Sequence, residues 1–175
     1  MSRSRKNILS LPLLFQITHE LAGQGKRIGL THGAFDLFHI THLDLFLKSA
    51  NLCDFLVVGV ESDENIQQYK SSGRPIIDQE SRMKLVSQTD CVDACFIIDE
   101  YPRPELYIDI YKELHIEFIT IGRYFHSEER VLYQTKKANI ELIHLYPDER
   151  YSTTMIIDKI KKANPEEKKV PYSQH

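Results

Sequence analysis

Short apolar segments alternate with longer amphipathic ones along most of the chain. Five short segments are rich in Val, Ile, Leu or Phe and have no polar face, which is typical of parallel strands buried on both sides: 27–31, 55–60, 94–98, 118–121 and 140–145. Apolar residues recur at helical spacing in 42–52, 62–69, 78–88, 104–115, 127–138 and 152–163. Strands that alternate with helices predict an α/β fold with a parallel sheet covered on both faces.

A further helix is predicted before the first strand. In residues 8–25, Leu14, Ile17 and Leu21 have helical spacing, and Gly23 and Gly25 mark the end of the helix. Its apolar side chains face either a partner molecule or the chain's own sheet: Leu11, Leu13, Leu14 and Phe15. We expect one domain over residues 1–164, with 1–25 as an N-terminal helical extension. Residues 165–175 have no periodic apolar set and are expected to be a disordered tail.

Composition narrows the class of protein. The chain has 175 residues, of which 42% are hydrophobic and 27% charged, enough for one buried core. It has no run of about 18 apolar residues, so we expect no membrane anchor. Its three cysteines, Cys53, Cys91 and Cys95, favour free thiols and a cytoplasmic location. The near balance of 22 basic and 25 acidic residues favours small-molecule partners over nucleic acid.

The loop after the first strand is the richest in candidate chemistry, because ligands of open parallel sheets bind beyond the carboxyl ends of the strands. His39 and His42 are three residues apart, which places both imidazoles on one face of the first turn of the next helix. Unpaired N–H groups and the positive end of the helix dipole lie there, an arrangement suited to phosphates. Gly33 would let a ligand approach the backbone, and Asp36 would brace the loop or orient a bound amine or metal. Two other interpretations of His39 and His42 remain. They could bind a metal ion together with further ligands, of which only His32 is near in sequence, or they could be surface residues without a function.

The same residues carry a family resemblance. Gly33-x-Phe35-Asp36-x-x-His39-x-x-His42 resembles the GxFDxxHxGH signature of the cytidylyltransferase-like nucleotidyltransferases. Further segments resemble the family pattern in the same order: Val58–Asp63, Lys70, Gly73–Ile76, Glu80–Met83, Val92-Asp93 and Tyr151–Ile157. The resemblance covers residues 25–162. It implies a Rossmann-like, doubly wound sheet of about five parallel strands, with helices on both faces.

The resemblance also implies a reaction. A phosphate oxygen of an acceptor attacks the α-phosphorus of a nucleoside triphosphate, and pyrophosphate leaves, so the protein's task is positioning and charge neutralisation. The catalytic residues implied are His39 and His42 toward the triphosphate, and Lys70 and Arg82 toward the acceptor or pyrophosphate. The nucleotide-binding residues implied are Thr31, Gly33, Ala34, Phe35, Asp36, His39, His42, Gly122, Arg123, Ser152, Thr153 and Thr154. Mg²⁺ is expected to enter with the triphosphate, with no protein metal site.

The sequence departs from the family pattern at two places, one that bears on activity and one that bears on the identity of the acceptor. Thr41 replaces the second glycine of the signature, and Gly122-Arg123 stands where Gly-Asp is common. The pattern around Lys70 and Arg82 resembles most the adenylyltransferases that act on heptose 1-phosphate, which implies ATP and a sugar phosphate. Glycerol-3-phosphate cytidylyltransferases, FMN adenylyltransferases and a nucleotide-binding module inactivated at Thr41 are the alternatives. The family resemblance further implies a homodimer.

Overall fold

A single parallel sheet organises the molecule. The computed structural model describes residues 8–99, 105–122, 128–146 and 150–163. The five strands lie in the order β3-β2-β1-β4-β5, and every neighbouring pair is parallel. Their bounds are β1 (Ile28–Gly33), β2 (Phe55–Glu61), β3 (Ala94–Ile98), β4 (Phe118–Ile121) and β5 (Glu141–His144). The order reverses between β3 and β4, so β1 and β4 form the switch point at which ligands of such sheets bind.

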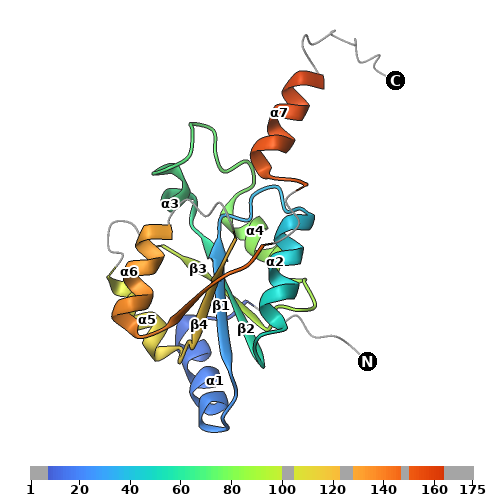
Figure 1. The fold of residues 1–175 in the computed structure, drawn as a ribbon. Helices are drawn as coiled ribbons and strands as arrows, with labels where there is room; N and C mark the ends of the chain where they lie inside the picture. Colours follow the sequence, from blue (N-terminus) through green and yellow to red (C-terminus); the bar gives the residue numbers. More distant parts are fainter. Residues whose placement is uncertain (1–7, 100–104, 123–127, 147–149, 164–175) are drawn as a thin grey trace.

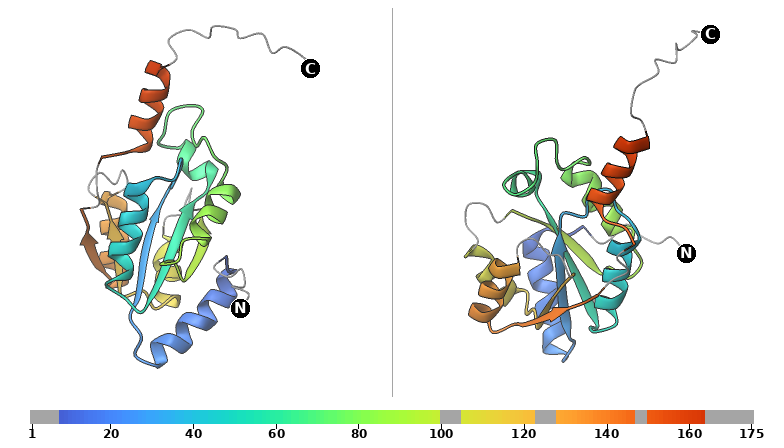
Figure 2. Two further views of the ribbon diagram at one scale, coloured as in Figure 1. Left: turned by 90° about the vertical axis from the view of Figure 1, so that its right-hand side faces the viewer. Right: turned by 45° about the horizontal axis from the view of Figure 1, so that its top comes forward.

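Helices cover both faces of the sheet (Figures 1 and 2). One face packs against α1 (Leu11–Gly23), α5 (Leu106–Glu113) and α6 (Glu128–Ala138), through a core that includes Leu14, Tyr111 and Val131. The other packs against α2 (Ile40–Ala50) and α4 (Gln79–Ser87), through Phe46 and Val86. The alternation of side chains along β2 separates the two cores, because Val57 belongs to the first and Val58 to the second.

The remaining two helices lie at the carboxyl edge of the sheet, where the strands end (Figure 1). The short α3 (Asp63–Gln67) follows β2 directly, and Ser62 caps it by accepting from the Asn65 N–H at 3.0 Å. α7 (Thr153–Ala163) projects away from the body of the molecule, and it contains no buried residue. These two helices therefore border the region in which the site is predicted.

The predicted α/β fold is confirmed. β3 and β4 have the predicted bounds, whereas β1 continues to Gly33 instead of ending at Thr31. For the helix before β1, packing on the chain's own sheet is the correct alternative, since Leu11, Leu14 and Phe15 contact the core. Leu13 is 44% exposed. The predicted tail, 165–175, lies outside the described residues.

Two further observations concern the sequence-based expectations. None of the described helices combines the length and the apolar character needed to cross a bilayer. Cys53, Cys91 and Cys95 all carry free thiols, and Cys95 is buried in the core beside α2 and α4.

Candidate active site

The turn between β1 and α2 has an unusual backbone. Phe35 and Leu37 adopt φ angles of 49° and 47°, in the left-handed region that bulky side chains seldom occupy. The turn is held by packing, because the Phe35 ring is buried and meets the rings of His42 and Phe46 edge-on, with centroids 5.4 Å and 4.8 Å away. Strained backbone that the surrounding structure maintains is common at binding and catalytic sites.

The two histidines of the signature stack on each other at the beginning of α2. The ring centroids of His39 and His42 are 3.8 Å apart with an interplanar angle of 24°. Burial, followed by the effect of His39, lowers the pKa of His42 to about 3, and burial also lowers the pKa of His39. Both rings are therefore neutral near pH 7. Within the described part of the chain, both ring nitrogens of His39 and Nδ1 of His42 are without a hydrogen-bond partner.

These ring nitrogens lie where an anion would be stabilised. His39 is the N-cap residue of α2, and its side chain does not cap the helix, so the imidazole stays available. The positive end of the helix dipole favours negative charge at the same place. Among the described residues no group of three or more His, Cys, Asp or Glu could hold a metal ion. The pair therefore presents ring nitrogens without partners in the described chain at the positive end of α2, where an anion could accept hydrogen bonds from ring N–H groups.

Asp36 is a brace. Its side chain is 1% exposed, and it accepts from the N–H groups of Ile76 and Ile77 at 2.9 Å and 3.0 Å and from Arg74 Nε at 2.8 Å. Burial alone would raise the pKa of Asp36, but the two N–H donors and the guanidinium outweigh it and hold the pKa below its usual value. Of the predicted alternatives for Asp36, the structure shows the brace: it fixes residues 74–77 against the turn after β1.

The beginning of α7 is tied to the same turn from the other side. Thr153 Oγ1 donates to the Asp36 carbonyl at 2.7 Å. Ser152 Oγ accepts from the Met155 N–H at 3.2 Å, as an N-cap residue does. The side chain of Thr41 also takes part, because its Oγ1 donates to the Tyr151 carbonyl at 2.7 Å. The residue that departs from the family signature thus joins α2 to the segment that begins α7.

Arg82 is completely buried and makes four hydrogen bonds within the protein. Nε donates to the Ile77 carbonyl at 2.8 Å, Nη1 to the Ala34 carbonyl, and Nη2 both to the Glu61 carbonyl at 2.8 Å and to Asp63 Oδ1 at 2.6 Å. The guanidinium thereby connects the segments after β1, after β2 and before α4. Its predicted contact with phosphate stays a prediction, whereas the contacts observed are those of a brace.

The other predicted residues lie in different parts of the molecule. Lys70 is half-buried near Arg74, Glu61 and Asp36; burial and then Arg74 lower its pKa. Four residues lie at the carboxyl ends of two neighbouring strands: Thr31, Gly33 and Ala34 at β1, and Gly122 directly after β4. Thr31 Oγ1 donates to the Thr120 carbonyl at 3.0 Å, and the Ala34 carbonyl accepts from Arg82. Thr154 lies exposed in the first turn of α7. Arg123 lies outside the described residues.

Apart from His32, sequence reasoning missed a polar cluster on the other face of the sheet. It consists of two buried residues, His32 at the end of β1 and Glu61 at the end of β2, and of two partly buried ones, Tyr69 after α3 and Arg130 in α6. A charged residue that closes an apolar strand, as Glu61 does, was the available signal. Nothing in the sequence of α6 distinguishes Arg130 from a solvated arginine.

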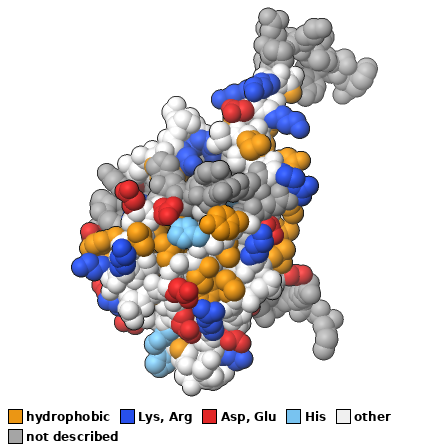
Figure 3. Space-filling view, viewed as in Figure 1, with side chains coloured by type: hydrophobic (Ala, Val, Ile, Leu, Met, Phe, Trp, Pro, Cys, Tyr) orange, Lys and Arg blue, Asp and Glu red, His pale blue; other side chains and the backbone are white. Residues whose placement is uncertain are grey.

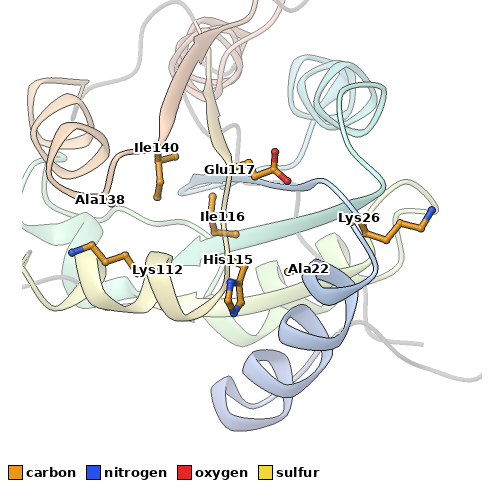
Figure 4. A pocket seen from close by; sticks show the side chains of 9 residues that line it. Ala22, Lys26, Lys112, His115, Ile116, Glu117, Ala138 and Ile140 are labelled. Atoms are coloured by element: carbon orange, nitrogen blue, oxygen red, sulfur yellow. The ribbon is translucent and has the colours of Figure 1, made fainter.

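The surface adds two observations. A cavity of about 390 Å³ lies at the amino ends of the strands, where Lys26, Lys112, His115 and Glu117 border it (Figure 4), and its lining contains none of the predicted site residues. On the face seen in Figure 3, basic side chains gather on α7, and charges of both signs are interspersed elsewhere. The chemistry therefore points to the carboxyl edge and not to this cavity.

The sequence of this chain is similar to the sequences of known proteins. A family model described as cytidylyltransferase-like matches residues 30–159. The "Bifunctional protein HldE" of Geobacter sulfurreducens is 32% identical over 163 residues, which are 91% of this chain and 32% of that protein. The chain thus spans about a third of the length of the curated relatives that it matches.

Two solved structures share the architecture. A lipopolysaccharide core biosynthesis protein from Thermoplasma volcanium is 25% identical, with a TM-score of 0.60, over 73% of this chain and 100% of that one. A pantoate-beta-alanine ligase from Francisella tularensis is 13% identical, with a TM-score of 0.57, over 90% of this chain and 78% of that one. The second likeness concerns the fold alone.

Proposed function

Because the chain belongs to the cytidylyltransferase-like family, we propose that it is a nucleotidyltransferase that transfers AMP from ATP to the phosphate of a sugar 1-phosphate, with heptose 1-phosphate as the first candidate. An oxygen of the acceptor phosphate bonds to the α-phosphorus of ATP. The bond from that phosphorus to the bridging oxygen of the β-phosphate breaks, and pyrophosphate leaves with the electron pair. Such a reaction needs alignment and charge stabilisation more than it needs a protein nucleophile.

The stacked pair of His39 and His42 is the observation that carries this proposal. Its ring nitrogens lie at the start of α2, beyond the end of β1, without protein partners in the described chain. The neutral rings would donate N–H groups to oxygens of the triphosphate, most strongly where charge builds up in the transition state. Their burial increases the strength of each such hydrogen bond, because less water competes for it.

The surrounding residues would complete the phosphate site. Thr153 brings the first turn of α7, which includes Thr154 and its N–H groups, next to the turn after β1. Lys70 is the half-buried cation from the α3 side and would meet the acceptor phosphate or the leaving pyrophosphate. We assign Mg²⁺ to the substrate, bound through phosphate oxygens, because the nearby Asp36 carboxylate is already fully engaged by the protein.

The choice of substrates rests on relatives and resemblance. The matched HldE proteins and the lipopolysaccharide core biosynthesis protein support a sugar phosphate, and the pattern around Lys70 supports ATP. CTP with glycerol 3-phosphate and ATP with FMN are the competing pairs. The expected homodimer and the cytoplasmic location are part of the same proposal and rest on the family alone.

Pyrophosphate release in the presence of magnesium tests the proposal. ATP, CTP, GTP and UTP are each combined with heptose 1-phosphate, other sugar 1-phosphates, glycerol 3-phosphate, phosphocholine, phosphoethanolamine and FMN. We expect release with ATP and a sugar 1-phosphate, and we expect its loss in His39→Ala with the fold intact by circular dichroism. If no combination of substrates released pyrophosphate while the chain still bound ATP, the proposal would be wrong and the chain would be a nucleotide-binding module.

A further inference from the structure

Helix α7 carries an apolar stripe that the described chain does not bury. Ile156, Ile157 and Ile160 share one side of the helix and form the α7 stripe, whereas Asp158 and Lys162 lie on the opposite side. None of the eleven residues of α7 is buried, Ile160 is 56% exposed, and the helix projects away from the body of the molecule (Figures 1 and 2). An isolated helix shorter than about 12–15 residues is only marginally stable in water, so α7 needs a surface on which to pack.

A second apolar stripe lies on the outer side of α2. Leu45 and Phe46 are buried on the inner side of this helix. Ile40 and Leu47 point the other way and are 42% and 47% exposed, and Leu43 lies partly exposed between them; these three residues form the α2 stripe. The outer side of a surface helix is normally polar, and a helix that is apolar on both sides is normally covered on both. The α2 stripe therefore indicates that a further element packs on α2.

The two stripes match in length and spacing. α2 and α7 each have eleven residues, which is about 16 Å of helix. Leu43 and Leu47 are four residues apart, and so are Ile156 and Ile160. The two helices also start at the same place, because the segment before α7 is hydrogen-bonded to the first turn of α2. From this junction α2 runs along the sheet, and α7 extends away from it (Figure 1).

The contacts at the junction keep α7 from packing on α2 of its own chain. Thr153 Oγ1 donates to the Asp36 carbonyl and Thr41 Oγ1 donates to the Tyr151 carbonyl, both at 2.7 Å. To fold back along α2, the chain would have to reverse its direction directly before Thr153 and break both bonds. A two-fold rotation about an axis through the junction instead places α7 of each copy along α2 of the other, so that both pairs of helices form at once. A second copy of the chain therefore covers both stripes.

The charges at the far ends of the two helices are complementary. The last turn of α7 carries two lysines. At the end of α2, Arg27 donates to the Leu52 carbonyl and also pairs with the exposed carboxylates of Glu117 and Glu141, so that one positive charge serves two negative ones. An anionic lipid surface would attract the lysines, but it would repel this acidic end and leave the α2 stripe uncovered. A second copy thus fits both helices better than a membrane does.

We propose that the α7 stripe of each copy docks on the α2 stripe of a second copy, in a reciprocal exchange of helices. The inference gives the proposed homodimer a specific interface, and it is independent of the proposed reaction. It also has a consequence for the candidate site. Thr153 and Thr154 belong to the first turn of α7, so the contact with the partner would hold this turn in place next to the histidine pair.

Sedimentation equilibrium of the whole chain over a range of concentrations tests this interface. We expect a dimer, and we expect Ile160→Glu to weaken it by about a hundredfold or more, because the reciprocal exchange places the new carboxylate in two apolar contacts. Leu47→Glu, on the other helix, should have the same effect. Both side chains are about half exposed in the single chain, so either variant should fold, and circular dichroism checks this.

Matched controls place the same charge on exposed apolar residues outside the two stripes. Met155 is 53% exposed and belongs to α7, but it lies on another side of the helix than Ile160. Leu132 is exposed on α6, which covers the opposite face of the sheet from α2. Met155→Glu and Leu132→Glu should therefore leave the dissociation constant of the dimer within about twofold of the wild-type value.

The outcomes separate this inference from the proposed function. A wild-type chain that is a monomer at every concentration, a folded Ile160→Glu or Leu47→Glu variant that dimerises like the wild type, or equal dissociation by Met155→Glu would each overturn the inference. A monomer that sediments with phosphatidylglycerol vesicles, and no longer does so as Ile160→Glu, would assign the α7 stripe to a lipid surface instead. A dimer that depends on both stripes but releases no pyrophosphate with any pair of substrates would overturn the proposed transfer and leave the inference in place.

Discussion

The replacement Arg82→Lys distinguishes a brace from a phosphate ligand. In the structure the guanidinium is fully buried and donates to three carbonyl groups and one carboxylate. Lysine keeps the charge and the aliphatic stem, but its compact ammonium cannot reach in the three directions that the planar fork covers. We expect two of the four acceptors to lose their donor in the variant, of which the Glu61 carbonyl is the most deeply buried.

The magnitude follows from the burial of those acceptors. A buried acceptor left without a donor costs about 1–3 kcal/mol, so two of them cost about 2–6 kcal/mol. The whole stability of a domain of this size is about 5–15 kcal/mol. With about 2–4 °C per kcal/mol, the melting temperature should fall by about 4–24 °C. If the main task of Arg82 were instead to bind phosphate, lysine would keep the positive charge, and the stability of the ligand-free chain would change little.

Urea and thermal unfolding of the chain without ligands measure this difference, and steady-state pyrophosphate release follows activity below the unfolding range. Lys84→Ala, on the exposed side of the same helix, controls for general effects on α4. A variant Arg82→Lys that unfolds like the wild type, while its KM for ATP or for the acceptor rises tenfold, would refute the reasoning and make Arg82 a phosphate ligand.

Three further predictions follow from the contacts of the turn after β1. Asp36→Asn should lower the free energy of unfolding by about 2–4 kcal/mol near pH 7, because Arg74 loses its charged partner. The pKa of Asp36 is lowered in the fold, so the difference in unfolding free energy between wild type and variant should shrink as the pH falls below the ordinary pKa of aspartate. Unfolding measured at a series of pH values checks this. Thr41→Gly should reduce kcat/KM about threefold to tenfold through the lost bond to Tyr151, and a many-fold rise in turnover would instead mean that Thr41 impairs the natural protein. The imidazole of His42, with a pKa of about 3, should not titrate between pH 5 and 8 in NMR spectra of the free protein, and a midpoint near 6.5 would contradict the neutral pair.

The architecture was predictable because the strands are short, apolar and bounded by polar residues. β3 and β4 were located to the residue, since Ala94–Ile98 and Phe118–Ile121 are uninterrupted apolar runs. The end of β1 was placed two residues too early, at Thr31 instead of Gly33, because His32 does not look like a core residue in a sequence. Its burial depends on Gly59 of a different strand, a relation between strands that no local pattern contains.

The sequence predicted the positions of the site residues better than it predicted their contacts. The signature located the histidine pair at the start of a helix, where the structure has it. It did not distinguish the residues that face a ligand from those that hold the turn. Asp36 binds Arg74, which is 38 residues away in the sequence, and Arg82 binds the Ala34 carbonyl, which is 48 residues away, so only the folded chain brings these groups into contact.

Residues that hold the site together and residues that face a ligand must be distinguished when variants are interpreted. The segments that would hold the two substrates are fixed to one another by charged braces, with Arg82 joining the ends of β1 and β2 and Asp36 joining the turn after β1 to the segment before α4. Loss of either brace would abolish turnover without touching a reacting atom. Loss of activity therefore identifies a catalytic group only where stability is retained, and on this criterion His39, which has no side-chain hydrogen bond to the described chain, is the residue at which activity and folding separate most cleanly.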